Sequence, residues 1–372
     1  MSKLTHQPRL WLETPLIYSS HISQRLGPGY NVYLKLETVQ PSHSFKSRGI
    51  SHYIREQFIK RGPSLHVVCA SGGNAGLAAA CASKTLGVKC TIFLPEGVDA
   101  GTHRFLAAQG ADVVVGGAVY QEALNAASAR VSQDENAVLA PAYDDKVVWD
   151  GHASMVEEIQ RQLPQGETPD AIFCCVGGGG LLGGIIVGCE RVGWDGVPIV
   201  ALETHGANCF IESISANKWP DLLRSENVTV LKDEEYGISF VRLGKLTSKA
   251  TSLGATAPSA GVVNMALKRS GGVQCASIPD EMAMQVVLSF ADDHKTLVEL
   301  ACATTLAPAY APGLLQRLVP TGPGQKTLVF VVCGGFKVST EHLKDYTDIL
   351  ENHMSKYWDV KLPDGETLSV PR

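Results

Sequence analysis

Hydrophobic residues along the chain fall in short runs that alternate with longer stretches of helical periodicity. The short runs are rich in Val, Ile, Phe and Cys, as is typical of buried strands, and cover residues 66–70, 90–95, 111–115, 171–176, 198–203 and 327–333. Helix-like stretches include residues 75–86, 103–109, 120–133, 153–162 and 181–192. Strands that alternate with helices in this way form parallel sheets with helices on both faces.

The alternation occurs twice, once before about residue 145 and once after it. The length of 372 residues also suits about two domains. We therefore expect an α/β protein with two doubly wound, mostly parallel sheets. Residues 217–258 are more irregular and charged, and the tail after Asp345 is polar.

Composition narrows the class of protein. Hydrophobic residues make up 45% and charged residues 19%, the balance of a soluble globular chain. The net charge of -5 leaves no electrostatic basis for binding nucleic acid or an anionic membrane surface. The most apolar long stretch, residues 301–315, is interrupted by Pro308 and Pro312 and does not predict a membrane span.

The N-terminus has no apolar segment of the secretory type, and the ten cysteines lie mostly in apolar runs. None forms a CxxC pair or a zinc-type spacing with histidine. Reduced, buried thiols in a cytoplasmic protein explain this pattern best.

Lys46 is the first candidate for chemistry. It lies in Ser-Phe-Lys-Ser-Arg-Gly at residues 44–49, just before an amphipathic stretch. A lysine buried at such a position has a lowered pKa, and its neutral amine forms a Schiff base with an aldehyde. Taken alone, the hexapeptide favours an exposed lysine in a first helical turn.

Residues 70–76, Ala-Ser-Gly-Gly-Asn-Ala-Gly, join a predicted strand to an Ala-rich helix. Small residues at a helix N-terminus leave backbone N–H groups free to bind a carboxylate. Ser71 adds a hydroxyl, and Asn74 can bond a ring oxygen. An ordinary turn capped by Ser or Asn fits the segment equally well.

Four glycines, Gly177, Gly178, Gly179 and Gly180, follow the strand at 171–176. Because consecutive glycines lose much backbone entropy on folding, a phosphate-binding loop explains them better than a simple turn. Gly178, Gly180 and Gly183 also match the dinucleotide fingerprint, with Glu203 near the distance of a ribose-binding acid. An NAD-dependent oxidoreductase is therefore an alternative, although it leaves Lys46 without a role.

Cys333 ends the apolar run at 327–333 and precedes Gly334 and Gly335. A core cysteine is the usual interpretation of such a thiol. Its place at a strand end, however, puts the sulfur at the edge where open α/β sheets bind ligands.

Taken together and in order, SFKSRG, SGGNAG, VGGGGLLGG and CGG resemble the fold-type II pyridoxal-phosphate (PLP) enzymes. They resemble most closely the branch of L-serine/L-threonine dehydratases, and WDGHAS at 149–154 and ALETHGA at 201–207 extend the likeness. The resemblance implies that PLP lies in the cleft between two domains. It implies a small domain of residues 40–149 and a large one of residues 1–39 and 150–372.

The resemblance also implies roles for individual residues. Lys46 would hold PLP and remove the Cα proton, Phe45 would pack on the ring and Asn74 would bond its hydroxyl oxygen. The phosphate would bind at 177–180 and Leu181, and Cys333 would meet the pyridine nitrogen. The substrate carboxylate would be bound by the loop residues Ser71, Gly72, Asn74 and Ala75.

By the same resemblance, a monovalent cation such as K⁺ would bind near the phosphate loop. Its ligands would be the carbonyls of Gly177, Ala207, Leu253 and Ala255, and Glu203 would be an acid of the active site or of the cation site. The family also implies a homodimer and an amino-acid substrate. Gly72 departs from members that carry alanine there.

A thiol at the pyridine nitrogen cannot keep it protonated as a carboxylate does, so the cofactor would be a weaker electron sink. This favours prompt elimination of a β-hydroxyl over transamination. The sequence thus predicts an ammonia-lyase acting on L-serine or L-threonine. A racemase or a β-replacement enzyme is the alternative within the family, and a non-catalytic protein of the same fold is a further one.

Overall fold

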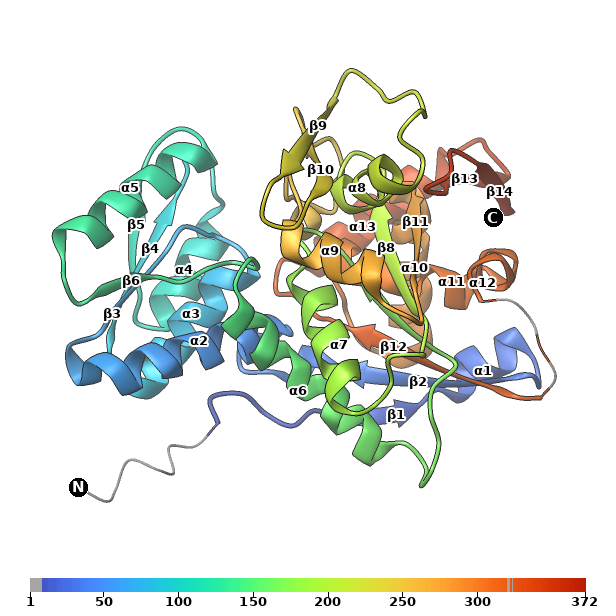
Figure 1. Cartoon of the computed structure of the whole chain (residues 1–372), viewed down its shortest axis with the longest axis horizontal. Helices are drawn as coiled ribbons and strands as arrows, with labels where there is room; N and C mark the ends of the chain where they lie inside the picture. The colour runs from blue at the N-terminus through green and yellow to red at the C-terminus, as the bar shows by residue number, and fades with distance from the viewer. Residues whose placement is uncertain (1–8, 320–321, 323) are drawn as a thin grey trace.

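The protein, a computed structural model described here over residues 9–319, 322 and 324–372, has two lobes with a sheet in each (Figure 1). The smaller lobe holds a four-stranded parallel sheet of order β5-β4-β3-β6. Its strands are β3 (His66–Cys69), β4 (Lys89–Leu94), β5 (Asp112–Val115) and β6 (Ala137–Leu139).

Helices cover both faces of this small sheet because successive strand residues point to opposite sides. Val67 and Cys69 pack in one cluster with residues of α2 and α3, whereas Val68 and Ala70 pack in another with residues of α5. The helices of this lobe are α2 (Lys46–Arg61), α3 (Asn74–Leu86), α4 (Ala100–Ala108) and α5 (Tyr120–Gln133).

The larger lobe holds an eight-stranded sheet. In spatial order its strands are β1 (Leu16–Tyr18), β2 (Tyr30–Leu36), β12 (Lys326–Val332), β7 (Ala171–Cys175), β8 (Ile199–Thr204), β11 (Val273–Ile278), β13 (Tyr357–Lys361) and β14 (Thr367–Pro371). From β2 to β11 all neighbours are parallel, while β1, β13 and β14 pair antiparallel at the edges. The predicted class, α/β with mostly parallel sheets, is confirmed.

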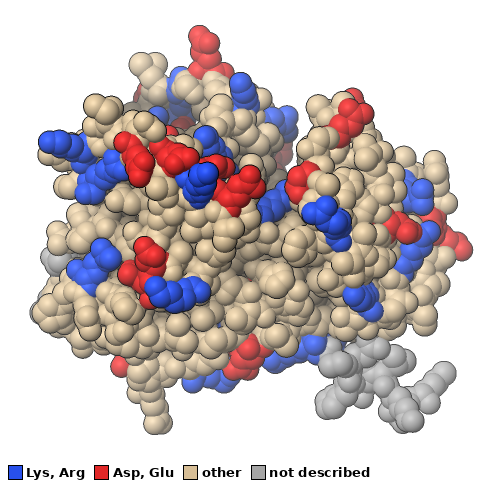
Figure 2. All heavy atoms as spheres, turned by 180° about the vertical axis from the view of Figure 1, so that it is seen from behind, with Lys and Arg blue, Asp and Glu red and all other residues tan. Residues whose placement is uncertain are grey.

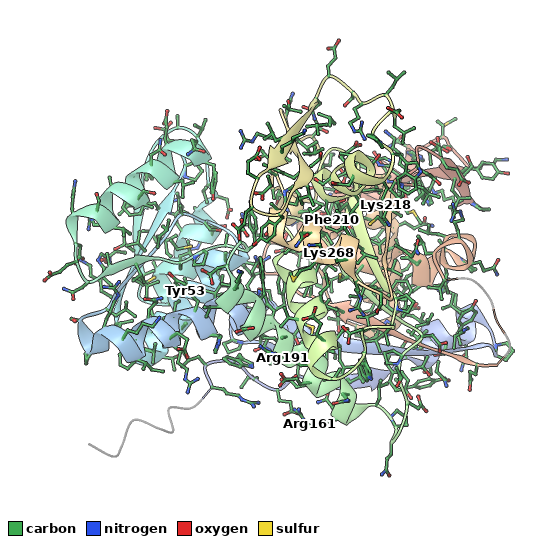
Figure 3. The ribbon with its side chains drawn as sticks, in the orientation of Figure 1. Tyr53, Arg161, Arg191, Phe210, Lys218 and Lys268 are labelled. Atoms are coloured by element: carbon green, nitrogen blue, oxygen red, sulfur yellow. The ribbon has the colours of Figure 1, made fainter. Side chains whose placement is uncertain are left out.

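The larger lobe contains most of the helices. Its helices are α1 (Ser20–Leu26), α6 (Lys146–Gln162), α7 (Gly180–Arg191), α8 (Cys209–Lys218), α9 (Ala260–Lys268), α10 (Asp280–His294), α11 (Leu300–Tyr310), α12 (Pro312–Leu318) and α13 (Thr340–Glu351). Figure 3 labels Arg191 at the end of α7 and Phe210 and Lys218 on α8. Helix α11 lies against β7, β8 and β12. Among the described helices, none has the length and hydropathy that a membrane crossing requires.

Short connecting helices lie at η1 (Glu37–Val39), η2 (Gly62–Ser64) and η3 (Thr251–Leu253). The predicted strands and helices are present with shifts of a few residues, and α6 starts earlier than its pattern indicated. Strands β1, β2, β6 and β11 had no strand prediction, and neither had two hairpins. One is β9 (Val228–Asp233) with β10 (Ile238–Leu243), inside the irregular segment, and the other is β13 with β14 in the polar tail. Both hairpins carry polar residues on an exposed face, so their sequences contain no continuous apolar run that would indicate a strand.

A buried ion network joins the two lobes at the start of α2. The guanidinium of Arg48 contacts Glu37 at 2.7 Å and Glu158 of α6 at 2.7 Å, and Lys35 of β2 contacts Glu158 at 2.7 Å. All four side chains are at most 1% exposed. Buried charges persist only when they are paired and hydrogen-bonded, so the network fixes where α2 begins relative to the large sheet.

Charged side chains of both signs lie next to one another on the face opposite to that of Figure 1 (Figure 2). Blue Lys and Arg groups stand beside red Asp and Glu groups there, and other residues form most of this face. Neighbouring charges of opposite sign limit the potential that such a surface projects into solution.

Candidate active site

A cavity of about 470 Å³ contains most of the predicted site residues. Its walls come from the loops that follow β3, β7 and β12 and from the start of α2. The carboxyl ends of parallel strands therefore meet here, as open α/β sheets arrange their ligand sites. The predicted residues in its lining are Phe45, Lys46, Ser71, Gly72, Asn74, Ala75, Gly177, Gly178, Gly179, Gly180, Leu181, Leu253, Ala255 and Cys333.

Lys46 and Cys333 are brought together by a short backbone pairing. The N–H of Phe45 donates to the carbonyl of Cys333 at 3.0 Å, and the N–H of Gly335 donates to the carbonyl of His43 at 2.7 Å. Gly334 has a φ of +81°, and a Cβ there would lie 2.2 Å from the His43 carbonyl oxygen. Only glycine allows this close approach.

Lys46 is the first residue of α2, and its half-buried side chain lines the cavity. The amine donates to the carbonyl of Ala142, and it lies 5.2 Å from the centre of the Phe45 ring. Burial lowers the pKa of Lys46 to about 8, because a charged amine loses its hydration there. The structure thus gives the neutral, nucleophilic form of this amine a larger share than an exposed lysine has.

The loop after β3 faces Lys46 across the cavity. Ser71 accepts a hydrogen bond from the N–H of Gly73 at 3.2 Å, and α3 starts at Asn74. Because the first amides of a helix have no partner within it, the loop presents donors to an anion. A Cβ on Gly72 would lie 2.9 Å from Leu94, so alanine at this position would push against that side chain.

Asn74 is held in one orientation by Glu299, a buried residue at the start of α11. The amide nitrogen of Asn74 donates to both carboxylate oxygens of Glu299 at 3.2 Å, and its oxygen accepts from the N–H of Phe336 at 3.2 Å. Glu299 also accepts from the N–H of Lys337 at 2.8 Å. Sequence reasoning assigned no role to Glu299, because its meeting with Asn74 depends on how the two lobes pack.

The tetraglycine loop lies under the ring of Tyr143. A Cβ on Gly178 would lie 2.5 Å from that ring, and Gly179 has a φ of +98° at the N-terminus of α7. Glycine is therefore needed for close packing and for the backbone turn. The turn leaves the first amides of α7 at the cavity, an arrangement that suits a phosphate. Tyr143 itself had no signal in the sequence.

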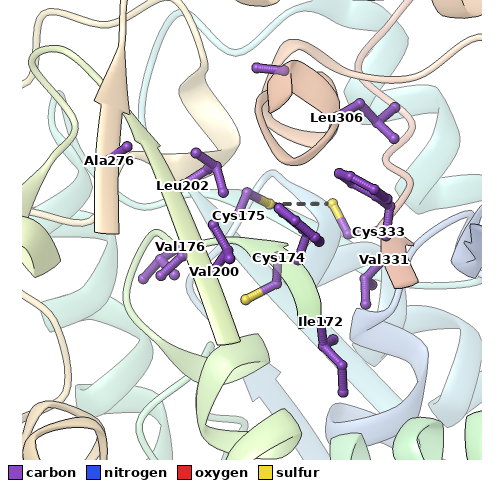
Figure 4. Packing of buried hydrophobic residues seen from close by; sticks show 14 of the residues in the cluster. Ile172, Cys174, Cys175, Val176, Val200, Leu202, Ala276, Leu306, Val331 and Cys333 are labelled. Atoms are coloured by element: carbon purple, nitrogen blue, oxygen red, sulfur yellow. Dashed lines mark hydrogen bonds between the residues drawn. The ribbon is translucent and has the colours of Figure 1, made fainter. Parts of the chain in front are cut away.

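Cys333 lies at the floor of the cavity with a second thiol beside it. Its sulfur is 3.6 Å from that of Cys175, the last residue of β7, and Figure 4 marks this contact with a dashed line. The sulfur of Cys302 accepts the N–H of Gly334 at 3.4 Å. The hydrophobic pattern alone did not show that these thiols meet.

Glu203 and Ala207 are absent from the cavity lining, although both are described and buried. The carboxylate of Glu203 accepts from the N–H groups of Phe210 and Ile211 at 3.0 and 2.7 Å, where it caps α8. Burial raises the pKa of this carboxyl well above its usual range. The structure therefore gives Glu203 a capping role and does not place it as a catalytic acid or a ribose-binding acid.

The predicted cation ligands are only partly assembled in the cavity wall. A Cβ on Gly177 would lie 3.0 Å from the Leu253 carbonyl oxygen, so the two backbones touch. Ala255 is two residues further on, and its N–H donates to the Leu253 carbonyl at 2.7 Å. Ala207 instead pairs with Thr204, behind the lining. Within the described residues, no cluster of three or more His, Cys, Asp or Glu suggests another metal site.

Comparison with known proteins identifies the class. The model of the family described as "Pyridoxal-phosphate dependent enzyme" matches residues 9–334, and the chain belongs to this family. The residues fit the cofactor, because a buried lysine of lowered pKa shares one cavity with a side-chain-free loop at a helix N-terminus. The family thus favours PLP over the dinucleotide interpretation of the glycine loop.

Three similar proteins give the context within the family. The chain is 38% identical to the human protein "Serine dehydratase-like" over 89% of this chain and 92% of that one. It is 37% identical to human "L-serine dehydratase/L-threonine deaminase", with 90% and 94% covered. The crystal structure of a fungal L-serine ammonia-lyase from Rhizomucor miehei has a TM-score of 0.79 and 31% identity, covering 93% of this chain and 99% of that one.

The lowered pKa of Lys46 predicts how cofactor capture depends on pH. Only the neutral amine attacks the aldehyde, so the rate should rise with pH and level off above about 8. Mixing cofactor-free protein with PLP and following the yellow colour at each pH measures this rate. In Lys46→Ala only exposed lysines remain to react, and their rate should still rise beyond pH 9, near their usual pKa of about 10.4. A wild-type rate without a plateau would contradict the assignment.

Proposed function

We propose that this enzyme is an L-serine ammonia-lyase that also accepts L-threonine. The reaction converts L-serine to pyruvate and ammonia, and L-threonine to 2-oxobutanoate and ammonia. The observation that carries the proposal is that Lys46, the tetraglycine loop and a thiol at Cys333 meet in one cavity. Relatives named for serine and threonine dehydration support the choice within the family.

Different residues of the cavity have different roles in the proposed reaction. Lys46 holds the cofactor and, once its amine is released, takes the Cα proton of the substrate. The amides of the loop after β3, with Ser71 and Asn74, bind the substrate carboxylate. Amides at 177–180 would hold the phosphate, and Asn74, which Glu299 holds in one orientation, would bond the ring hydroxyl oxygen. PLP supplies the electron sink for the carbanion that proton removal leaves.

The thiol at the predicted ring-nitrogen position supports elimination. Hydrogen bonds with the thiols of Cys175 and Cys302, together with burial, raise the pKa of Cys333 well above its usual range, which favours the neutral S–H form. A neutral thiol does not keep the pyridine nitrogen protonated, which weakens the electron sink. Such a cofactor would favour loss of the β-hydroxyl over return of the Cα proton.

A potassium ion bound by carbonyls of Gly177, Leu253 and Ala255 forms part of this proposal. Support comes from the backbone contact between Gly177 and Leu253, which places the Leu253 carbonyl oxygen against the glycine loop. Hard cations such as K⁺ prefer oxygen ligands of this kind. A homodimer and a location in the cytoplasm stay predictions from the sequence, as do the domain limits at residues 40 and 149.

The test is keto-acid formation from L-serine, L-threonine and their D-isomers in one buffer that contains potassium. We expect product from both L-isomers, little from the D-isomers, and a lower rate when potassium is exchanged for a tetraalkylammonium ion. Chiral analysis of residual serine serves as the control for racemisation. D-serine formed from L-serine without any keto acid would overturn the proposal in favour of a racemase.

A further inference from the structure

Three thiols meet at the floor of the cavity. Cys175 ends β7, Cys333 follows β12 and Cys302 lies on α11. All three are buried, but Cys175 and Cys333 also line the cavity. The mechanism above uses only Cys333, so Cys175 has no assigned role.

The geometry singles out Cys175 and Cys333 as a pair. Their sulfurs are 3.6 Å apart, in van der Waals contact, on neighbouring parallel strands that hold the two backbones in place (Figure 4). A disulfide brings its sulfurs to about 2.05 Å, so each sulfur needs to move by less than about 1 Å. Figure 4 shows Cys174, one residue earlier, pointing away from this contact.

The surroundings favour a thiolate on one member of the pair. The hydrogen bond from Cys333 lowers the pKa of the Cys175 thiol, against the effect of burial. Both thiols also act electrostatically on the Lys46 amine, which places a cation near them while that amine is free and protonated. Thiolate character next to a cation is what makes a cysteine reactive toward oxidants.

We propose that Cys175 and Cys333 form a redox-sensitive modification site, at which a hydroperoxide such as H₂O₂ converts the two thiols to a disulfide. The thiolate of Cys175 attacks the peroxide, breaks the O–O bond and becomes a sulfenic acid, with release of hydroxide. The sulfur of Cys333, as it loses its proton, then displaces hydroxide from that sulfenic acid to form the S–S bond. The two hydroxides take up the two protons that Cys175 and Cys333 release, which gives two waters. In total, two thiols and one H₂O₂ give one disulfide and two waters.

This site goes beyond the proposed function, because it depends on the sulfurs and the cavity and not on the substrate. The cavity of about 470 Å³ gives a small peroxide a route to both thiols. A cofactor bound over Cys333 would close that route and neutralise the nearby amine. Oxidation is therefore expected to be fast in the cofactor-free protein and slow in the PLP-loaded protein, and to hinder reloading.

The test treats the full chain, PLP-loaded and cofactor-free, with H₂O₂, blocks the remaining thiols and maps the peptides by mass spectrometry. We expect a linked peptide joining Cys175 to Cys333, at least about tenfold faster without PLP and removed by dithiothreitol. PLP uptake, followed by absorbance, should fall as the link forms and recover on reduction. Uptake reports on the site without any assay of turnover.

Cys175→Ser and Cys174→Ser form a matched pair of variants, since both replace a buried thiol on β7. We expect the link and the loss of PLP uptake to disappear in Cys175→Ser and to persist in Cys174→Ser. Circular dichroism checks that each variant is folded. A link between Cys302 and Cys333 in place of the expected one, no link at all, or equal rates with and without PLP would overturn the proposal.

Discussion

Replacing Lys46 by alanine will lower the rate of keto-acid formation from L-serine by at least about 10²–10⁴-fold, the usual contribution of a positioned acid–base group. The loss should exceed this range, because the same amine also anchors the cofactor. The physical reason is its position, since Lys46 lines the cavity and desolvation of its amine lowers its pKa to about 8. Steady-state keto-acid assays with added PLP measure the effect.

A matched control is Lys60→Ala, which removes an exposed lysine from the last turn of the same helix. Its activity should stay close to that of the unaltered enzyme. Borohydride treatment of the yellow protein, followed by peptide mapping, should label Lys46 and not Lys60. Turnover that survives in Lys46→Ala at a comparable rate would remove Lys46 from the mechanism.

The largest effect on stability is expected for Arg48→Met. This change leaves the carboxylates of Glu37 and Glu158 buried and only partly paired, with Lys35 as the remaining cation. Breaking a buried ion pair from one side costs about 3–5 kcal/mol, because the remaining charge keeps its desolvation penalty. Urea unfolding followed by circular dichroism should show an earlier midpoint, and PLP affinity should also fall because Lys46 lies two residues away.

The exposed ion pair between Arg191 of α7, labelled in Figure 3, and Asp150 of α6 provides the comparison. Its side chains are 41% and 49% exposed, so water already solvates both charges. Surface pairs of this kind are worth about 0–1 kcal/mol, and Arg191→Met should shift the midpoint little. Similar shifts for the two variants would show that the buried network does not stabilise the start of α2.

Several parts of the molecule were determined by the sequence itself. The apolar runs at 66–70, 171–176 and 327–333 are buried strands, because only continuous hydrophobic runs suit a parallel sheet covered on both faces. The glycines at 177–180 indicated a loop closely approached by other groups. Both properties are local, since they depend on residue type and order within about ten positions. The predictions of these three strands were accurate for this reason.

Contacts that arise only when distant segments pack together were not predicted from the sequence. Glu299 clamps Asn74 across 225 positions of the chain, and Cys175 reaches Cys333 across 158. The local sequence around these residues does not indicate either contact. The residue type of a buried carboxylate or thiol is the same whichever partner packs against it. The role predicted for Glu203 found no support for a related reason. Its place at a strand end suggested the ligand edge, whereas its carboxylate caps the following helix.

The sequence by itself determined the alternation of strands and helices that defines the fold class, the glycine loops and the lysine at the start of α2. Tertiary structure alone decided that the amine of the half-buried Lys46 loses hydration inside the cavity. Its hexapeptide favours an exposed lysine, but the pairing of residues 43–45 with 333–335 and the ion network at Arg48 hold the helix start against the large sheet. Burial is set by what surrounds a side chain, and those surroundings come from segments nearly 300 positions apart. The lowered pKa of Lys46 and the thiols beside it follow from that packing.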